Sequence, residues 1–446
     1  MSDKNPSPEA LARFGGAIAL PTVSNVDYAK TDFAPFDAFK AYLKGAFPLF
    51  HKRTELTVVN NYALVYRWKG RDAGALPLLL CAHYDVVPVE AGTETAWTHP
   101  PFSGAAAEGR VWGRGALDVK CQITAQMEAA EGLMAAGFIP PRDIYFAYGH
   151  DEEVGGAEGA QKIAERFAAQ GLRFEGVLDE GGSVITDAIK GARCPLALIG
   201  IAEKGHASYL LTVTDKGGHS STPPAHSALG RLARLIVRVE GHPLPRRLTP
   251  ALRAMLVGIK DALGGGFRLA VGAPGLFKPV ILKALAKTPA TNALTRTTFA
   301  LTMAKASDAP NVLPQQAQAL VNVRLLHGDS SESVRRYIEK LVGREATVQV
   351  ILPHEPSKVS PADSGVFIKL KALVSEVFPG AIAAPYLVTG GTDARKYYAV
   401  SDNVYRFTPA QLSTQEVQTM HNTNESLSIE NYGKMILFYR RFVEGE

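Results

Sequence analysis

A continuous apolar run at residues 75–82, Ala-Leu-Pro-Leu-Leu-Leu-Cys-Ala, constrains the fold of this chain more than any other segment. A strand that is exposed on one face alternates apolar and polar residues, whereas a strand that is buried on both faces is apolar throughout. The run is far shorter than the roughly 18 residues of a membrane-spanning helix. It therefore predicts a central strand in a sheet that is covered on both faces.

Strands and helices alternate on either side of this run. The sequence predicts strands at 143–148 and 176–178 and helices at 119–136 and 157–170. Asp118 is the expected N-cap of the helix at 119–136, and Gly137 is its expected end. At the N-terminus, Ser7 and Pro8 predict the start of another helix. This alternation indicates an α/β domain with a mainly parallel sheet.

The pattern changes after about residue 204. The expected order there is strand, helix, strand, strand, helix and strand, at 208–214, 228–239, 297–304, 319–325, 332–342 and 347–352. This order is the ferredoxin-like arrangement. We therefore expect a discontinuous catalytic domain, formed by residues 1–204 and 356–446, that is interrupted by an α+β lid or dimerisation domain at 205–355.

The predicted inserted domain contains an irregular stretch of its own at about 241–290. Three consecutive glycines, 264–266, and several prolines interrupt its apolar residues. Two interpretations stay open: a surface insertion that packs on its own domain, or a lid over an apolar substrate pocket.

The composition excludes several classes of protein. The chain has 446 residues and a formal net charge of 48 − 43 = +5, and this charge is too small and too evenly spread to indicate a nucleic-acid or membrane partner. Its three cysteines, without close pairing, exclude a disulfide scaffold and favour a reducing compartment. The first residues lack the pattern of a secretory signal. We therefore expect a cytoplasmic enzyme.

Acidic residues and a histidine follow the predicted strands at the points where they end. His83 and Asp85 come directly after the apolar run, and alternation along a strand places both on one side. Alone, such a pair is most simply a structural hydrogen bond. The pattern recurs, however, at Asp118, Glu152-Glu153 and Asp179-Glu180. Because sites in open α/β sheets form beyond the carboxyl ends of the strands, we expect these residues to share one crevice.

So many carboxylates in one crevice require compensation. Without a counter-charge they repel one another, and at least one has to stay protonated. Multivalent cations remove the conflict, and two zinc ions need roughly eight ligand atoms of the histidine and carboxylate types, with one bridging carboxylate.

Three motifs carry a resemblance to a known family. They are the segments 83–88, 113–120 and 151–156, His-Tyr-Asp-Val-Val-Pro, Gly-Arg-Gly-Ala-Leu-Asp-Val-Lys and Asp-Glu-Glu-Val-Gly-Gly. In this order they resemble the co-catalytic di-zinc exopeptidases and amidohydrolases, which include aminoacylase, succinyl-diaminopimelate desuccinylase and glutamate carboxypeptidase. The segments 149–153 and 178–182 are most similar to the carboxypeptidase S branch, which also contains N-fatty-acyl-amino-acid hydrolases and synthases. One departure is Ala82, where many relatives have Gly.

The resemblance implies a zinc-exopeptidase-like catalytic domain with two zinc ions per subunit, with Co²⁺ or Mn²⁺ as possible substitutes. The implied ligands are His83, Asp118, Glu153, Asp179 and His421. Asp118 would bridge both ions, and Glu152 would be the general base and acid. Asp85 would orient His83.

The resemblance also implies how substrate is bound. The implied residues are His219, Asn311 and Arg324. The segment 390–395, with Gly391 and Arg395, is a second candidate cradle for a carboxylate on the α/β domain. His219 would reach the active site of a partner subunit, which implies a homodimer. A guanidinium suits a substrate carboxylate, although Arg324 could also be an ordinary surface residue of a strand.

The leading hypothesis is therefore hydrolysis of an amide bond next to a free carboxylate, in a small peptide or an N-acyl amino acid. Two alternatives stay open. One is an N-fatty-acyl-amino-acid hydrolase or synthase with an apolar acyl pocket, and the other is a non-catalytic relative that only binds.

Overall fold

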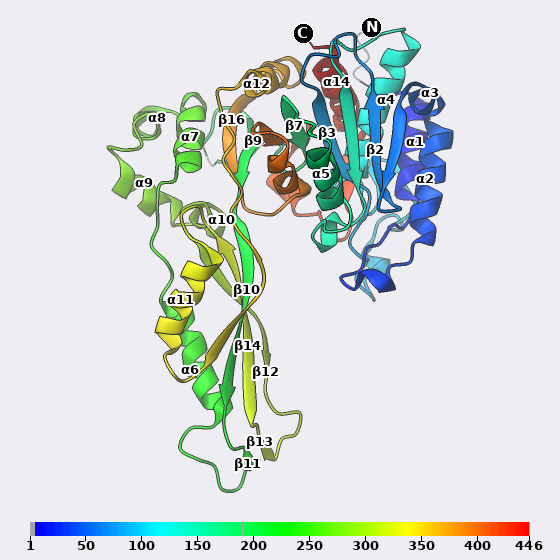
Figure 1. Ribbon diagram of the computed structural model, residues 1–446. Helices are drawn as coiled ribbons and strands as arrows, with labels where there is room; N and C mark the ends of the chain where they lie inside the picture. Colours follow the sequence, from blue (N-terminus) through cyan, green and yellow to red (C-terminus); the bar gives the residue numbers. More distant parts are fainter. Residues whose placement is uncertain (1–4, 190, 446) are drawn as a thin grey trace.

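The computed structural model describes residues 5–189 and 191–445, and Figure 1 shows an α/β body above an elongated second unit. The large sheet of the α/β body contains ten described strands. Nine of them follow the order β1-β2-β6-β3-β7-β17-β9-β8-β18, and β16 pairs with β9. Their bounds are β1 Glu55–Val59, β2 Ala63–Trp68, β3 Leu78–His83, β6 Ile144–Gly149, β7 Gly176–Asp179, β8 Val184–Ile185, β9 Leu196–Glu203, β16 Ile382–Val388, β17 Val404–Arg406 and β18 Gln411–Leu412.

The centre of this sheet is parallel, as the sequence predicts. Strand β3 pairs in parallel with β6 and β7, and β7 pairs in parallel with β17. Every residue of β3 is buried, which confirms the strand predicted from the apolar run. The antiparallel pairs are β1–β2, β2–β6, β17–β9 and β8–β9.

Helices cover both faces of the sheet. One face carries α1 Pro8–Ile18, α2 Ala34–Ala46, α3 Pro48–Arg53, α4 Lys120–Ala135, α12 Gly365–Val377 and α14 Ile429–Glu444. The other face carries α5 Ala160–Ala169 and the 3-10 helix η5 Asp393–Ala399. Ser7 accepts a hydrogen bond from the Ala10 amide and caps α1, as expected. Asp118 does not cap α4, which begins at Lys120, because its carboxylate faces two histidines instead.

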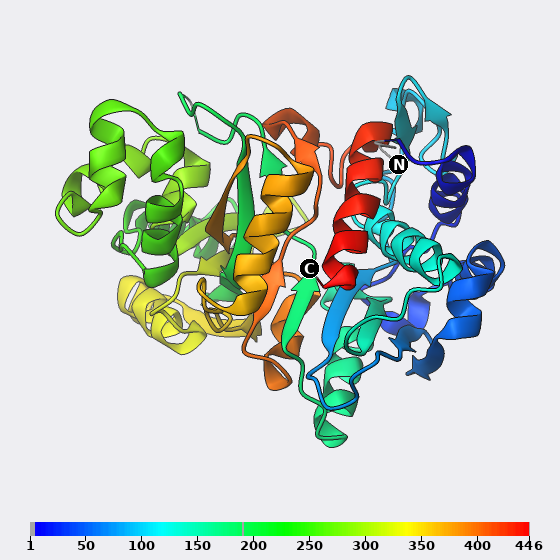
Figure 2. The same ribbon diagram turned by 90° about the horizontal axis from the view of Figure 1, so that it is seen from above.

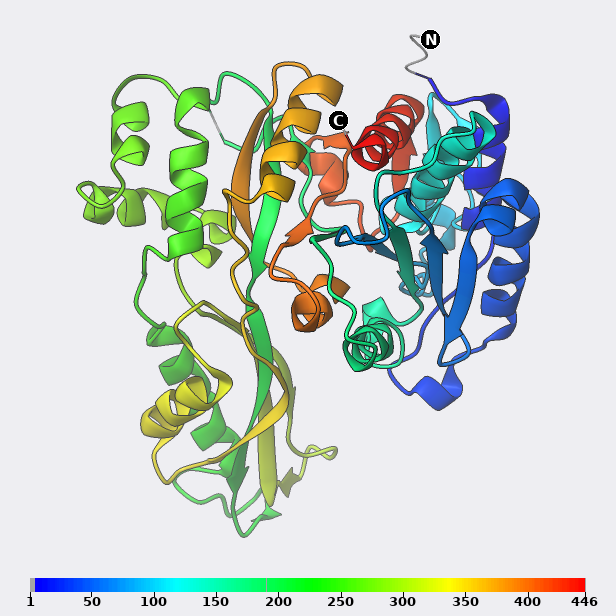
Figure 3. The same ribbon diagram turned by 45° about the horizontal axis from the view of Figure 1, so that its top comes forward.

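The second unit has the predicted ferredoxin-like order. Its elements are β10 Gly205–Thr214, α6 Ala228–Gly241, β12 Thr298–Lys305, β14 Gln316–Leu325, α11 Ser331–Val342 and β15 Thr347–His354. The strand order is β12-β14-β10-β15, and α6 and α11 pack on one face of this sheet (Figures 1 and 3). At the far end of the unit lies a small ribbon of β11 Gly218–His219 and β13 Val312–Leu313.

The stretch expected at 241–290 forms the helices α7 Pro250–Gly258, α8 Gly265–Gly272 and α9 Lys278–Leu285, followed by α10 Pro289–Ala293. Leu252 and Met255 of α7 are buried in the core of the α/β body, and Gly258 lies so close to β16 that a Cβ there would be 2.9 Å from Pro385. These helices therefore do not pack on the inserted sheet, as one interpretation expected. They extend the α/β body beyond β16 (Figures 1 and 2).

The other interpretation, a lid over an apolar substrate pocket, is not supported either. A pocket of about 690 Å³ does lie between α7, α12 and β16. None of the predicted metal or substrate residues lines it.

A short three-stranded sheet joins two distant parts of the chain. Its strands are β4 Ala106–Ala107, β5 Arg110–Trp112 and β19 Ser426–Ser428. The pairing of β19 with β5 brings the segment that follows His421 against the segment that precedes Asp118. The remaining short helices are α13 Thr414–Val417, η1 Tyr28–Lys30, η2 Glu94–Ala96, η3 Glu152–Val154 and η4 Lys260–Ala262. Among the described residues, no helix is both long enough and apolar enough to cross a membrane.

Candidate metal centre

Asp118 lies between two histidines that come from opposite ends of the chain. Its Oδ1 is 3.0 Å from Nε2 of His83, and its Oδ2 is 2.9 Å from Nε2 of His421. His83 is the last residue of β3, and Asp118 lies two residues before α4. Each oxygen of one carboxylate thus faces a different imidazole, which is the arrangement that a bridging ligand requires.

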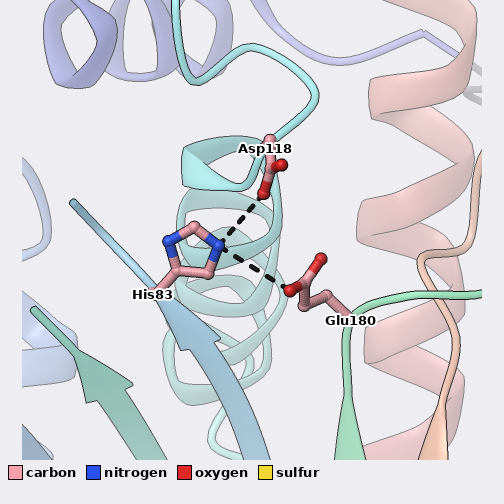
Figure 4. Close-up of side chains that lie close together, drawn as sticks. All are labelled: His83, Asp118 and Glu180. Carbon is pink, nitrogen blue, oxygen red and sulfur yellow. Dashed lines mark hydrogen bonds and ion pairs between the residues drawn. The ribbon is translucent and has the colours of Figure 1, made fainter. Parts of the chain in front are cut away.

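Each histidine is accompanied by a further carboxylate. In the first group, Oε1 of Glu180 lies 3.8 Å from Nε2 of His83 (Figure 4). In the second group, Oε2 of Glu153 lies 3.2 Å from Nε2 of His421. Within each group of three residues, the possible ligand atoms lie within 4.8 Å of one another. The two groups share Asp118, so the described residues offer two adjoining metal sites.

Asp179, the sequence-predicted ligand beside His83, is not part of either group. Its place next to Leu178 in β7 puts it at the level of Cys81, two residues before His83 at the end of β3. It is fully buried there, and neither of its oxygens has a hydrogen-bond partner among the described residues. Glu180 lies just beyond the strand end and has a longer side chain, so it reaches His83 instead. The sequence contained both acidic residues, and only the register distinguishes them.

Asp85 supports the site from behind His83. Its Oδ1 lies 3.3 Å from Nδ1 of His83. The same buried carboxylate accepts hydrogen bonds from the hydroxyl of Ser24 and from the backbone amides of Glu152 and Glu153. Asp85 thereby fixes the orientation of one imidazole and the position of both glutamates. The sequence analysis did not predict a role for Ser24, because this residue lies far from every motif.

Glu425 joins the two loops that carry Asp118 and His421. Its buried carboxylate accepts hydrogen bonds from the backbone amides of Gly115, Leu117 and Asp118. Arg114 donates a further bond of 2.6 Å to it. The sequence analysis did not select Glu425, because its spacing from Asp118 exceeds any local motif.

The protonation equilibria follow from burial and from this crowding of charge. Burial raises the pKa of Glu180 well above its ordinary value, and the charge of Asp118 adds to the effect. Asp118 behaves in the opposite way: burial is outweighed by hydrogen bonds from His421 and His83, which lower its pKa. The hydrogen bonds of His421 with Asp118 and Glu153 raise the pKa of His421 to about 10. In the absence of cations, Glu180 and His421 therefore hold protons that offset the negative charge of the centre.

Glu152 lies beside the ligand groups without belonging to either. Its Oε2 is 4.0 Å from Nε2 of His83. Burial raises its pKa well above the ordinary value; His83 opposes this shift, while the charges of Glu180 and Asp393 add to it. A carboxyl group with a raised pKa beside a metal site can accept and return a proton.

The residues expected to bind substrate fall into two places. Arg395 lies 3.5 Å from the buried carboxylate of Glu203 and donates a hydrogen bond to the carbonyl of Glu355. Arg324 faces His206 across the β10–β14 pair, and the ring of His206 stacks on His354, which precedes Glu355 in the chain. Burial and the charge of Arg395 together lower the pKa of Arg324. Gly391 lies in the same turn as Asp393, whose carboxylate lies against Gly149, the residue that pairs with His83. The turn at 390–395 therefore lies between Arg395 and the metal centre.

His219 and Asn311 lie elsewhere. Both are exposed at the far end of the second unit, beside the ribbon β11–β13 (Figure 1). The amide of Ser220 donates to the carbonyl of Asn311, which holds the two residues together. Within one chain, the structure does not bring them to the metal centre. His150, which follows β6, is not in either ligand group; its Nε2 lies 3.0 Å from the hydroxyl of Tyr28.

The donor atoms fit two divalent cations. Each group supplies one imidazole nitrogen and carboxylate oxygens, the ligand types that zinc and similar ions take. Oε1 of Glu153 is buried and has no hydrogen-bond partner among the described residues, as a free ligand atom would be; both oxygens of Asp179 share this state but lie outside the two groups.

Comparison with known proteins agrees with this geometry. A family model described as "Peptidase family M20/M25/M40" matches residues 79–445. The chain belongs to this peptidase family. A relative named "Probable carboxypeptidase S-like 2", from Dictyostelium discoideum, is 36% identical over 98% of this chain and 85% of its own length. An "N-fatty-acyl-amino acid synthase/hydrolase PM20D1" from Xenopus tropicalis is 33% identical over 96% of this chain and 84% of its own length.

A solved structure shares the fold of the M20 chain. It is an M20 family metallo-carboxypeptidase from Sulfolobus solfataricus, with a TM-score of 0.75, 19% identity and coverage of 98% of this chain and 99% of that one. The predicted fold class, a zinc-exopeptidase-like α/β domain with an inserted α+β unit, is thereby confirmed. The family confirms the expected metal-dependent hydrolase, and the two relatives confirm the branch indicated by the sequence.

Proposed function

We propose that this M20 chain hydrolyses an amide bond next to a free carboxylate, using two divalent cations held by His83, Asp118, Glu153, Glu180 and His421. The observation that carries the proposal is Asp118, whose two oxygens face two different histidines. Zinc is the proposed ion, because imidazole and carboxylate donors suit it, and Co²⁺ or Mn²⁺ would offer similar coordination.

Glu152 is the proposed general base and acid. When bound, the cations would polarise the scissile carbonyl and lower the pKa of a water molecule. Glu152, held near His83 by the bonds from its own amide to Asp85, takes a proton from this water and delivers it to the nitrogen of the leaving amine. Its raised pKa favours the protonated form, which returns the proton to the amine.

Arg324 and Arg395 are the proposed partners of the substrate carboxylate. They lie at the junction of the two units, and the turn that contains Gly391 leads from them to the metal centre. A guanidinium can bind a carboxylate through two parallel hydrogen bonds. This arrangement favours substrates that end in a carboxylate, which both a peptide and an N-acyl amino acid possess.

We also propose a homodimer, in which His219 and Asn311 complete the site of the partner chain. Both are exposed at the far end of the second unit, where they can act only on another molecule. The three cysteines are free, and a reducing compartment, the cytoplasm, stays a proposal on that ground.

The second candidate is hydrolysis, or reverse synthesis, of N-fatty-acyl amino acids. It is favoured by the 33% identity to the Xenopus protein of that name. The two candidates share the chemistry at the metal centre and differ only in the group on the far side of the amide bond.

A panel of substrates tests the proposal. We expect hydrolysis of acetyl or decanoyl amino acids, or of dipeptides, and a loss of at least about 100-fold in kcat/KM when the free carboxylate is replaced by a carboxamide, because the charged partner of the arginines is lost. Mass spectrometry of the products measures each rate. Faster cleavage of decanoyl than of acetyl compounds would select the second candidate. Equal rates for acids and carboxamides would contradict the proposal, and bound metal without any hydrolysis would indicate a non-catalytic relative.

The choice of Glu180 over Asp179 is tested by metal binding. Because loss of even an outer hydrogen-bond partner weakens metal binding by 10–100-fold, we expect Glu180→Gln to lower the affinity of one ion by at least about 100-fold. Asp179→Asn, its matched control, should keep both ions. Metal per chain, measured by mass spectrometry after dialysis against a competing chelator, distinguishes the variants. Loss of metal from Asp179→Asn alone would restore Asp179 as the ligand.

A further inference from the structure

The helices α8 and α9 expose an unusual number of large apolar side chains. Leu276 is 83% exposed, and Phe267 and Leu269 are each 71% exposed. We define the α8–α9 surface by its apolar residues Phe267, Leu269, Leu276, Phe277 and Val280. Large apolar side chains that are exposed on two neighbouring helices and the loop between them make this segment a candidate place of interaction.

These side chains are exposed although the two helices that carry them are anchored to the hydrophobic core. Val271 of α8 and Ile281 of α9 are buried and attach the two helices to the α/β body. The helices lie at the outer edge of the molecule, on the side of β16 that is away from β3 (Figures 1 and 2). The apolar residues therefore project from a supported platform.

The charged side chains of α8 and α9 are basic. Arg268 of α8 pairs with Asp261, whereas Lys278 and Lys283 of α9 and the neighbouring Lys287 lie in a segment, residues 262–307, that contains no Asp or Glu. Lys278, Lys283 and Lys287 are exposed, and none forms an ion pair with a described residue. The net charge of +5 concealed this segment, so the expectation of an even charge distribution is wrong here.

We propose that the α8–α9 surface binds an anionic lipid surface. Exposed apolar side chains can enter the boundary between headgroups and acyl chains, while neighbouring lysines pair with anionic headgroups. This is peripheral binding and needs no spanning helix. A second copy of the chain is a poorer occupant, because a two-fold contact through this surface would place each lysine-rich segment against itself.

Flotation with lipid vesicles tests the proposal on the full-length protein. We expect binding to vesicles of phosphatidylcholine mixed with phosphatidylglycerol and little binding to phosphatidylcholine alone. Each basic residue near an anionic surface strengthens binding about fivefold, so the triple variant Lys278→Glu, Lys283→Glu, Lys287→Glu should bind at least about 100-fold more weakly. The control Lys44→Glu, Lys52→Glu, Lys340→Glu changes the net charge equally at exposed sites elsewhere and should bind like the wild type.

A second variant tests the apolar part. Phe267→Ser with Leu276→Ser changes only exposed side chains, so the melting temperature should be unchanged while binding to anionic vesicles falls at least about tenfold. Equal binding to neutral vesicles, or unchanged binding of both variants, would overturn the proposal. The proposal would also be overturned if the wild-type protein were a dimer and both variants were monomers that still bound vesicles. The surface would then be a contact between chains. The amide-hydrolysis rate on soluble substrates should be unaffected, which separates this test from that of the proposed function.

Discussion

Replacement of Glu152 by Gln is expected to lower kcat by about 10²–10⁴-fold, the usual contribution of a positioned general base. Gln keeps the size of the side chain and the backbone bond to Asp85, but it cannot take a proton. Because Glu152 lies outside both ligand groups, the variant should keep its metal. Steady-state kinetics and metal analysis on the same sample measure both effects.

The control for this variant is Glu165→Gln on the exposed face of α5, where the same change removes only an exposed ion pair with Lys162. It should leave kcat and metal content unaltered. Near-normal turnover of Glu152→Gln would contradict the proposed mechanism. Loss of metal from Glu152→Gln would instead show that Glu152 acts as a ligand.

Removal of the metal ions is expected to abolish hydrolysis and also to destabilise the protein. A ligand that binds only the folded state at 1,000 times its Kd stabilises that state by about 4 kcal/mol. The metal-free centre also leaves Glu152, Glu153 and Glu180 close together. Thermal unfolding with and without a chelator measures the difference, and added Zn²⁺ should restore both activity and melting temperature.

This difference should widen as the pH rises from about 5.5 to 8. In the metal-free protein, burial raises the pKa of Glu152 and Glu180 well above their ordinary value, and that of Asp179 to about 6. A carboxyl group whose pKa is higher in the folded than in the unfolded state binds more protons when folded, so its contribution to stability is lost as the pH rises through the folded value. His421, with a pKa of about 10 in the folded state, changes stability in the same direction.

The metal-bound protein should respond in the opposite sense, because deprotonated ligands bind cations more tightly. Asp118 does not affect this comparison: its pKa is lowered, so its contribution is lost only in acid, below the ordinary value. A constant difference in melting temperature across this pH range would contradict the inference that protons replace the cations in compensating the negative charge of the centre.

Local patterns predicted much of the fold and part of the site. The apolar run predicted β3, and the position of His83 at its end follows from strand alternation. Asp179 shows where such reasoning stops. Asp179 and Glu180 are adjacent acidic residues at a strand end, so the sequence pattern does not distinguish them. Only the pairing of β7 with β3 shows that Asp179 lies within the sheet, before the strand ends that carry the site. That register depends on tertiary packing.

Long-range contacts were likewise beyond local patterns. Glu425 accepts hydrogen bonds from three backbone amides of residues 115–118, more than 300 positions away in the chain. No periodicity in the sequence predicts such a contact. The helices at 250–285 illustrate a related limit. Neither interpretation of this stretch foresaw its packing on β16, which follows more than 90 residues later in the chain.

The pairing of β19 with β5 has a consequence for how the protein is made. His421 and Glu425 are synthesised about 300 residues after Asp118. A ribosome-bound chain that has not yet reached them can form the group around His83 but not the second one. The two halves of the centre are therefore completed at different times during synthesis, and the shared ligand Asp118 waits for its second histidine.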